Sequence, residues 1–190
     1  MVKTQLIAHE KEVYDIAFAQ GVNTFASAGA DGSIRHFDTR NLEHSTIIFE
    51  SQDQTPFVRV AWNREDPNYL ATIMMDSNKV IIVDIRYPML PFLELTGHSN
   101  CVNSIAWAPT SGYDVSKSII RIHICTAGDD AQTLIWDLTG PQPRQAERPD
   151  PLEPMLAYRA EEEVTMLQWP MSNPEWICIS FNSKMQMLKV

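Results

Sequence analysis

Histidine, hydroxyl, carboxylate and indole side chains follow one another in the second half of this chain in an order that suits hydrogen-bond chemistry. His98 comes first, after a glycine, and Thr126, Asp130 and Trp136 follow. An imidazole can bridge a hydroxyl and a carboxylate, and a carboxylate beside a tight turn can also cap that turn. We therefore predict a structural network that joins His98, Thr126, Asp130 and Trp136 and binds no ligand. The alternative is two unrelated strands that happen to contain His and Trp.

A second copy of the pattern lies near the start of the chain. His9, Ser27 and Asp31 match the histidine, hydroxyl and carboxylate, but Phe37 stands where the tryptophan would be. Phenylalanine packs but cannot donate a hydrogen bond. The first network is therefore expected to have one hydrogen bond fewer than the second.

Catalytic chemistry has little support in the sequence. There is no phosphate-binding glycine loop, no G-x-S-x-G motif and no H-E-x-x-H motif. Three histidines have no nucleophile at a recognisable motif spacing: His36, His44 and His123. Three cysteines, without a CxxC pair, lie in apolar runs and are expected to be buried thiols: Cys101, Cys125 and Cys178. We expect no enzyme activity, and no catalytic, cofactor or metal site.

Short apolar and β-branched runs separated by turn signals must position these side chains. Such a pattern is typical of strands, and no segment has a helical period. The expected class is all-β. Strands are predicted over residues 3–8, 13–18, 24–28, 34–38, 46–50, 57–62, 69–74, 79–84, 92–95, 101–107, 123–127, 134–136, 155–160, 164–169, 176–181 and 185–190.

A glycine–histidine pair, three short strands and a closing Trp-Asp resemble one blade of a WD-repeat β-propeller. We divide the chain into four such repeats, 3–40, 44–86, 92–138 and 155–190, within one domain. The second repeat is degenerate, because it has no histidine and Val83 replaces the tryptophan. Residues 112–121 are predicted to be a surface insertion, with a recognition loop as the alternative, and the proline-rich residues 139–154 an irregular loop.

Charge and composition narrow the classes of partner. The net charge is −9 and no run of Lys or Arg offers a surface for a phosphate backbone, so we expect no direct nucleic-acid binding. No apolar run approaches the roughly 20 residues that cross a bilayer, and residues 1–10 lack a signal peptide. We expect a soluble intracellular protein.

Several segments resemble the transparent testa glabra family of plants, which has animal relatives that act as kinase scaffolds and ubiquitin-ligase adaptors. The segments are Ala8–Ala17, Glu43–Ile48, Met75–Val80, Ile105–Pro109 and Lys184–Val190. The resemblance implies a non-enzymatic scaffold in nucleus and cytoplasm that assembles MYB and basic helix-loop-helix transcription factors. In plants these control epidermal cell fate and flavonoid or anthocyanin pigment. Family members have seven blades, so this chain matches only their C-terminal part, and its open edges are expected to favour self-association.

Two arginines support an alternative function. Ligase adaptors of this kind often carry an arginine two residues after the Trp-Asp aspartate, and Arg40 and Arg86 follow Asp38 and Asp84 at that spacing. The hypothesis is a substrate receptor of a cullin-RING ubiquitin ligase, or a kinase scaffold, with these arginines as candidate contacts. Solvated arginines at strand ends are the simpler interpretation. A propeller hydrolase is the remote alternative.

Overall fold

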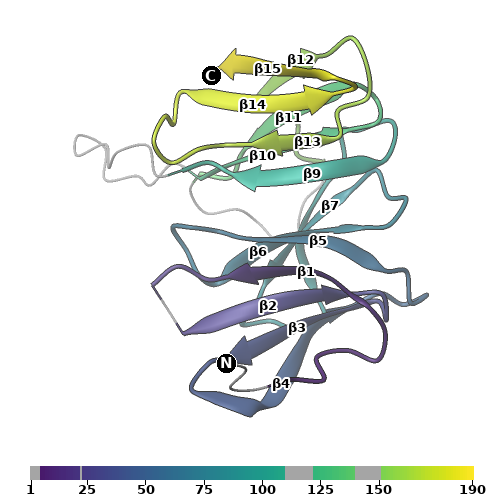
Figure 1. Cartoon of the computed structure of the whole chain (residues 1–190), viewed down its shortest axis with the longest axis vertical. Coiled ribbons are helices and arrows are strands. Elements are labelled where there is room, and N and C mark those ends of the chain that lie inside the picture. Colours follow the sequence, from purple (N-terminus) through teal and green to yellow (C-terminus); the bar gives the residue numbers. More distant parts are fainter. Residues whose placement is uncertain (1–4, 22, 110–121, 140–150) are drawn as a thin grey trace.

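The computed structural model describes residues 5–21, 23–109, 122–139 and 151–190. Over these ranges the chain is all-β and consists of four antiparallel sheets in chain order (Figure 1). Each sheet is a β-meander in which consecutive strands pair, as expected for propeller blades. The predicted fold class is therefore confirmed.

The first two sheets have four strands each. The first contains β1 (Val13–Phe18), β2 (Thr24–Gly29), β3 (Ser33–Asp38) and β4 (Asn41–Glu50). The second contains β5 (Phe57–Trp62), β6 (Tyr69–Met74), β7 (Val80–Asp84) and β8 (Pro91–Leu95).

The third sheet also has four strands, and the fourth has three among the described residues. The third contains β9 (Val102–Trp107), β10 (His123–Gly128), β11 (Gln132–Asp137) and β12 (Leu156–Arg159). The fourth contains β13 (Met166–Gln168), β14 (Trp176–Phe181) and β15 (Lys184–Lys189).

The sheets stack in an open row, with the first and the last at opposite ends of the molecule (Figure 1). The first strand of each sheet contacts the first strand of the next: β1 contacts β5, β5 contacts β9, and β9 contacts β13. Side-chain hydrogen bonds reinforce these contacts. The Asp15 carboxylate accepts a bond from the backbone N–H of Val60 at 2.9 Å, and Asn103 Nδ2 donates to the carbonyl of Val164 at 3.0 Å.

Three hydrophobic clusters fill the spaces between the four sheets. The alternation of side chains along a strand explains how one strand serves two clusters. In β7, Ile81 and Val83 point toward the first sheet, whereas Val80 and Ile82 point toward the third. All four side chains are buried, because this sheet has a neighbour on both faces.

Some details differ from the sequence predictions. β4 begins at Asn41, five residues before the predicted start, and residues 5–8 form no strand although a strand was predicted over 3–8. The three cysteines are free, but only Cys125 is fully buried, while Cys101 and Cys178 are half-buried. The predicted insertion 112–121 and most of the proline-rich segment lie outside the described residues.

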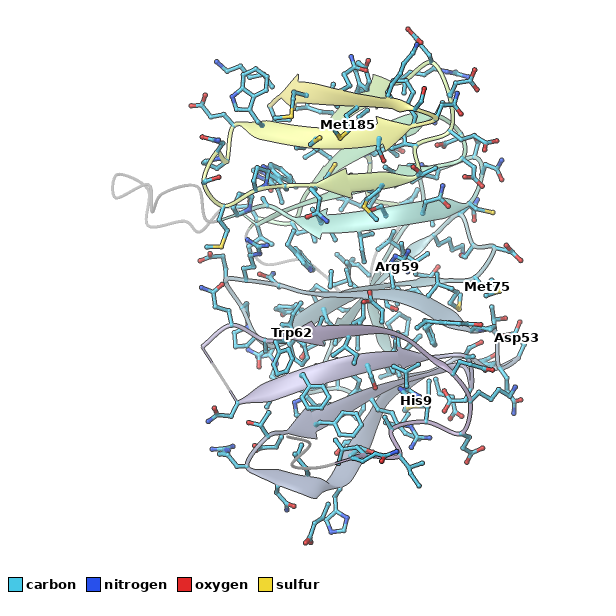
Figure 2. The ribbon with its side chains drawn as sticks, in the orientation of Figure 1. His9, Asp53, Arg59, Trp62, Met75 and Met185 are labelled. Atoms are coloured by element: carbon cyan, nitrogen blue, oxygen red, sulfur yellow. The ribbon has the colours of Figure 1, made fainter. Side chains whose placement is uncertain are left out.

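The strands run between two faces of the molecule, which we call the His face and the Trp face. His9 and His98 define the His face and precede the inner strands β1 and β9. Trp62, Trp107 and Trp169 define the Trp face; they close β5 and β9 and follow β13. Figure 2 shows Trp62 toward the left, and Asp53 and Met75, from turns of the His face, on the right.

Candidate functional site

The four residues of the predicted network meet inside the third sheet. His98 Nδ1 lies 3.0 Å from Asp130 Oδ1, and His98 Nε2 lies 2.8 Å from Thr126 Oγ1. Trp136 Nε1 donates to the same Thr126 hydroxyl at 3.0 Å. His98, Thr126 and Trp136 are all buried, so these bonds are shielded from water.

When the imidazole is neutral, the hydrogen bonds of this network can run in only one direction, from the Trp136 indole to the Asp130 carboxylate. The indole N–H can only donate, so Thr126 Oγ1 accepts from it and turns its own hydrogen toward His98 Nε2. His98 Nδ1 then carries the ring hydrogen and donates it to the Asp130 carboxylate. Each hydrogen-bonding atom in the series Trp136, Thr126, His98 and Asp130 then has a partner.

Asp130 connects this network to the backbone. Burial by itself would raise the pKa of Asp130, but hydrogen bonds from His98 and from the backbone N–H groups of Ser99 and Gln132 outweigh it and lower the pKa. The ionised carboxylate therefore holds the turn after β10 and the segment before β9 together. Gly97 completes the packing, because a Cβ there would lie 2.7 Å from Trp136 Cη2.

The corresponding residues of the first sheet form a related network. His9 Nδ1 lies 2.9 Å from Asp31 Oδ1, and His9 Nε2 lies 2.6 Å from Ser27 Oγ. Phe37 is buried in the place of the tryptophan and stacks on Phe25 at 4.8 Å between ring centroids. With no indole to donate, Ser27 Oγ bonds only to His9 among the described residues.

Ser33 strengthens the carboxylate end of this first network. Its hydroxyl donates to Asp31 Oδ1 at 2.8 Å and lies 3.1 Å from His9 Nδ1. Burial opposes ionisation of Asp31, but hydrogen bonds from Ser33, from the backbone N–H of Glu10 and from His9 lower the pKa of Asp31 to about 2. This carboxylate is therefore ionised throughout the neutral range.

The two histidine networks have the properties of structural supports. His9 and His98 are 7% and 5% exposed, and both ring nitrogens of each are already hydrogen-bonded. No group of three His, Cys, Asp or Glu in the described ranges is arranged to hold a metal ion. No helix in the same ranges is long and apolar enough to span a bilayer. What the networks do chemically is hold turns on the His face.

Arg40 and Arg86 lie on the opposite face, each in the turn that leads to the last strand of its sheet. Both pair with the aspartate two residues earlier. Arg40 Nη2 lies 2.6 Å from Asp38 Oδ2, and Arg86 Nη2 lies 2.8 Å from Asp84 Oδ2. In both pairs the arginine Nε and backbone N–H also donate to the aspartate, so the Asp-x-Arg spacing forms a closed turn.

The environments of the two arginines differ. The Asp84 side chain is 3% exposed, and hydrogen bonds from Arg86 to it raise the pKa of Arg86. The Arg86 guanidinium also bonds to the Tyr69 hydroxyl at 3.1 Å and lies over the Tyr69 ring. Arg40 is more exposed: its side chain is 71% exposed, and that of Asp38 is 32% exposed. Arg86 is thus partly a structural residue, whereas Arg40 is presented to solvent.

The tryptophans of the Trp face were not among the functional residues predicted from the sequence. Trp62 and Trp169 each donate from Nε1 to the carbonyl of a proline five residues later, Pro67 and Pro174, at 2.8 Å. Trp107 instead donates to the Ala61 carbonyl in the neighbouring sheet at 2.9 Å. The repeated spacing Trp-x4-Pro was the signal in the sequence that could have located this surface.

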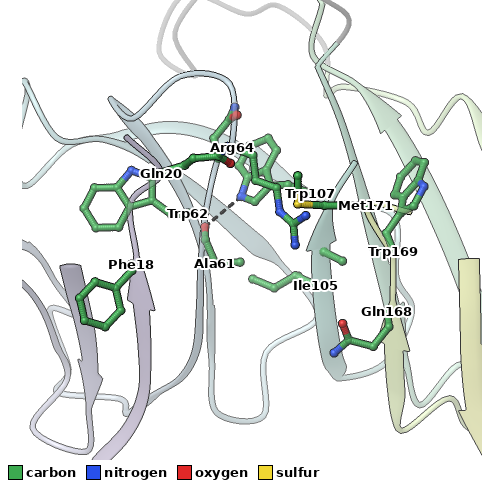
Figure 3. A pocket seen from close by; sticks show the side chains of 12 residues that line it. Phe18, Gln20, Ala61, Trp62, Arg64, Ile105, Trp107, Gln168, Trp169 and Met171 are labelled. Atoms are coloured by element: carbon green, nitrogen blue, oxygen red, sulfur yellow. Dashed lines mark hydrogen bonds between the residues drawn. The ribbon is translucent and has the colours of Figure 1, made fainter. Parts of the chain in front are cut away.

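These three tryptophans border a pocket on the Trp face (Figure 3). Its volume is about 310 Å³. Residues from all four sheets line it, and they are Phe18, Gln20, Ala61, Trp62, Asn63, Arg64, Ile105, Ala106, Trp107, Gln168, Trp169 and Met171. Arg64 is the one charged side chain among these described residues, and its guanidinium and the Met171 side chain extend toward each other (Figure 3).

Comparisons with known proteins agree with this architecture. The family model for "WD domain, G-beta repeat" matches residues 1–38 and 90–137. It leaves out the second and fourth repeats, and the second nevertheless folds as the complete sheet β5–β8.

Three relatives show how far the similarity extends. A DDB1- and CUL4-associated factor 7 homolog of Dictyostelium discoideum is 54% identical over 99% of this chain and 53% of its own length. A WD repeat-containing protein of Saccharomyces cerevisiae is 43% identical over 72% of this chain and 28% of its own length. A WD repeat-containing protein of Schizosaccharomyces pombe is 32% identical over 99% of this chain and 53% of its own length.

The chain therefore spans about half the length of the Dictyostelium and Schizosaccharomyces relatives. The Dictyostelium and Schizosaccharomyces matches extend over 99% of the chain and therefore over all four sheets. WD-repeat proteins typically work as binding scaffolds and not as enzymes, because the loops on the two faces of a rigid propeller present surfaces to other proteins. The chain is a WD-repeat protein and is similar, over nearly its whole length, to the DDB1- and CUL4-associated factor 7 homolog of Dictyostelium discoideum.

Proposed function

We propose that this chain is part of a non-enzymatic scaffold that associates with DDB1 and CUL4 as a receptor subunit of a ubiquitin ligase. The observation that carries the proposal is the 54% identity, over nearly the whole chain, to a protein named for its association with DDB1 and CUL4. The proposed surface is the part of the Trp face around Arg40 and Arg86.

The geometry of the two arginine turns supports this surface. Each arginine is held by its own aspartate through several hydrogen bonds, so little side-chain entropy is lost when a partner docks. Arg40 and Arg86 come from neighbouring sheets and lie on the same face. They present two rigid guanidinium groups to acceptors on the ligase adaptor.

The test is co-purification of DDB1 with the tagged chain from cells, using variants chosen from the two environments. Arg40→Glu reverses an exposed charge and is expected to abolish recovery of DDB1 without loss of folding. Arg86→Gln is preferable to Glu, because a second carboxylate beside the buried Asp84 would destabilise the turn. Arg159→Glu, an exposed charge reversal at the His-face end of β12, is the matched control.

Recovery of DDB1 is expected to fall for Arg40→Glu and Arg86→Gln and to stay unchanged for Arg159→Glu. Thermal unfolding of each variant shows that it is folded. Equal recovery of DDB1 with all three folded variants would contradict the proposed surface.

A second candidate function is assembly of MYB and basic helix-loop-helix transcription factors in nucleus and cytoplasm. The resemblance of Met75–Val80 to plant scaffold proteins favours it, and this segment lies on the His face. There, Val102 N–H donates to the Ser77 carbonyl at 2.9 Å and Asn78 Nδ2 donates to the His98 carbonyl at 3.1 Å. The segment is thus held rigidly against the third sheet.

Because the two candidate surfaces are on opposite faces, one experiment separates the two functions. Arg40→Glu is expected to lose DDB1 while MYB and basic helix-loop-helix proteins are still recovered. If neither transcription factor is recovered with the unaltered chain, the second function is wrong.

A further inference from the structure

The pocket on the Trp face contains two buried hydrogen-bond donors that have no partner among the described residues. These are Asn63 Nδ2 and Arg64 Nη1. Asn63 is 3% exposed. Buried donors of folded proteins are nearly always hydrogen-bonded, so two neighbouring exceptions that line one pocket point to an acceptor that comes from outside.

The orientation of the Asn63 amide is fixed by its oxygen. Asn63 Oδ1 accepts hydrogen bonds from the backbone N–H groups of Glu65 at 2.8 Å and Asp66 at 3.2 Å. Exchanging the amide oxygen and nitrogen would place donors against donors, so the assignment of Nδ2 is secure. Asn63 is one of the residues that line the pocket, and its NH₂ group is the part of the amide that has no partner among the described residues.

The charge of the pocket selects an anionic ligand. Arg64 is the one charged side chain among the described residues that line it, and no carboxylate belongs to that lining. The Asp66 side chain faces its own turn, where Oδ1 accepts two hydrogen bonds from Asn68. A guanidinium and an adjacent amide NH₂ together match the two oxygens of a carboxylate.

The walls of the pocket suit an apolar side chain beside that carboxylate. Trp62, Trp107 and Trp169 form rigid sides, and each uses its indole N–H in a hydrogen bond with a protein carbonyl. Met171 is 57% exposed at the rim, where a thioether side chain adapts to different partners. A volume of about 310 Å³ is at the lower limit of small-molecule sites and accommodates one or two peptide side chains.

We propose that this pocket binds an acidic segment of a partner protein, with a Glu or Asp side chain held by Arg64 and Asn63 and a neighbouring apolar side chain against the tryptophans. A cationic side chain is excluded because Arg64 would repel it. A purely apolar ligand would leave both buried donors without acceptors. The site is separate from Arg40 and Arg86, so it does not depend on the ligase proposal.

The test uses two fluorescein-labelled peptides that differ in one side chain, Gly-Ser-Leu-Glu-Leu-Ser-Gly and the same peptide with Gln in place of Glu. Fluorescence anisotropy measures the affinity of each for the purified chain. The Glu peptide is expected to bind at least about tenfold more tightly, which corresponds to about 1.4 kcal/mol.

Two variants of the pocket and one control assign this difference to the named side chains. Arg64→Gln removes the charge. Asn63→Asp keeps the oxygen that accepts from Glu65 and Asp66 but replaces the free NH₂ group with a second oxygen. Both variants are expected to abolish the preference for Glu. Arg59→Gln is the matched control, because Arg59 lies in β5, the strand that precedes Asn63, is outside the pocket and is exposed (Figure 2).

Several results would overturn the proposal. Equal affinity of the Glu and Gln peptides, or no binding of the Glu peptide up to about 1 mM protein, contradicts the carboxylate recognition. A loss with Arg59→Gln equal to that with Arg64→Gln shows a general charge effect. Displacement by inorganic phosphate at concentrations near the peptide Kd shows a site for free anions, to which the tryptophans contribute nothing. If Arg64→Gln does not fold, Asn63→Asp and the peptide pair still decide the matter.

Discussion

Trp136 packs closely against Gly97, and the first sheet has a different pair of residues at the two equivalent positions. There, Phe37 replaces the tryptophan and Ala8 replaces the glycine. A Cβ at Gly97 would lie 2.7 Å from Trp136 Cη2, so the larger ring of the third sheet excludes even a methyl group. We therefore expect Trp136→Phe and Gly97→Ala to compensate each other.

The cost of each single change follows from these contacts. Trp136→Phe removes the donor to Thr126 Oγ1, which costs about 1 kcal/mol. It also leaves a cavity in a fully buried site, at a fraction of the roughly 3–5 kcal/mol measured for removal of a whole aromatic side chain. The total is about 2–3 kcal/mol. Gly97→Ala forces a methyl group against the indole and is expected to cost about 1–3 kcal/mol by overpacking.

In the double variant the new methyl group enters space that the indole has left. If the single effects were independent, they would add to roughly 3–6 kcal/mol. We expect the double variant to lose only about 2 kcal/mol, of which the missing hydrogen bond accounts for about half. The favourable coupling is therefore about 1–4 kcal/mol, in the upper part of the range found for residues in contact.

Urea unfolding of the four proteins, followed by circular dichroism, measures this coupling. The midpoints are compared only where the slopes of the transitions agree, because a changed slope indicates a changed unfolded or native state. Additive losses in the double variant would refute the steric argument. An unchanged midpoint for Trp136→Phe alone would show that the indole hydrogen bond contributes nothing.

Two further predictions concern ionisable groups. The pKa of Asp31 is about 2, below its ordinary value of 3.8, so its ionisation stabilises the fold above about pH 4 and this contribution is lost as the pH falls toward 2. The contribution is on the order of 2 kcal/mol. Asp31→Asn should therefore lower the free energy of unfolding at neutral pH and make it depend less on pH between pH 5 and 2.5, as measured by urea unfolding. An unchanged dependence of this free energy on pH would contradict the prediction. Burial raises the pKa of Cys125. An aromatic disulfide reagent should therefore modify Cys101 and Cys178 in the folded protein within minutes and Cys125 only as it unfolds, and three equal rates would contradict the burial.

The sequence predicts most of the strands because the repeats carry regular local signals. β5, β6 and β14 begin and end where their apolar runs predict, and Asp31-Gly32 predicts the turn in which Gly32 has a positive φ of 76°. β4 is longer than predicted because its first five residues are mostly polar, and they are recruited by pairing with β3. Tertiary context, and not propensity, extends that strand.

The pocket is harder to predict for a different reason. Asn63 and Arg64 belong to a polar stretch between two strands, which resembles an ordinary solvated loop in the sequence. Their burial arises only when the ends of the inner strands of four sheets come together. Arg86 is a similar case, since its partner Asp84 is buried by the fold and no local pattern shows that.

The three clusters between the four sheets have a consequence for how such a protein gains cooperativity. In a row, each added sheet creates one new core with its neighbour, so four sheets share three cores. In a closed ring the last sheet creates two cores at once, one on each side, while every earlier sheet after the first creates one. Stability therefore does not grow in equal steps with the number of blades. The step that completes the ring is the largest. A blade in the middle of a row packs against two neighbours, whereas a blade at its end packs against one.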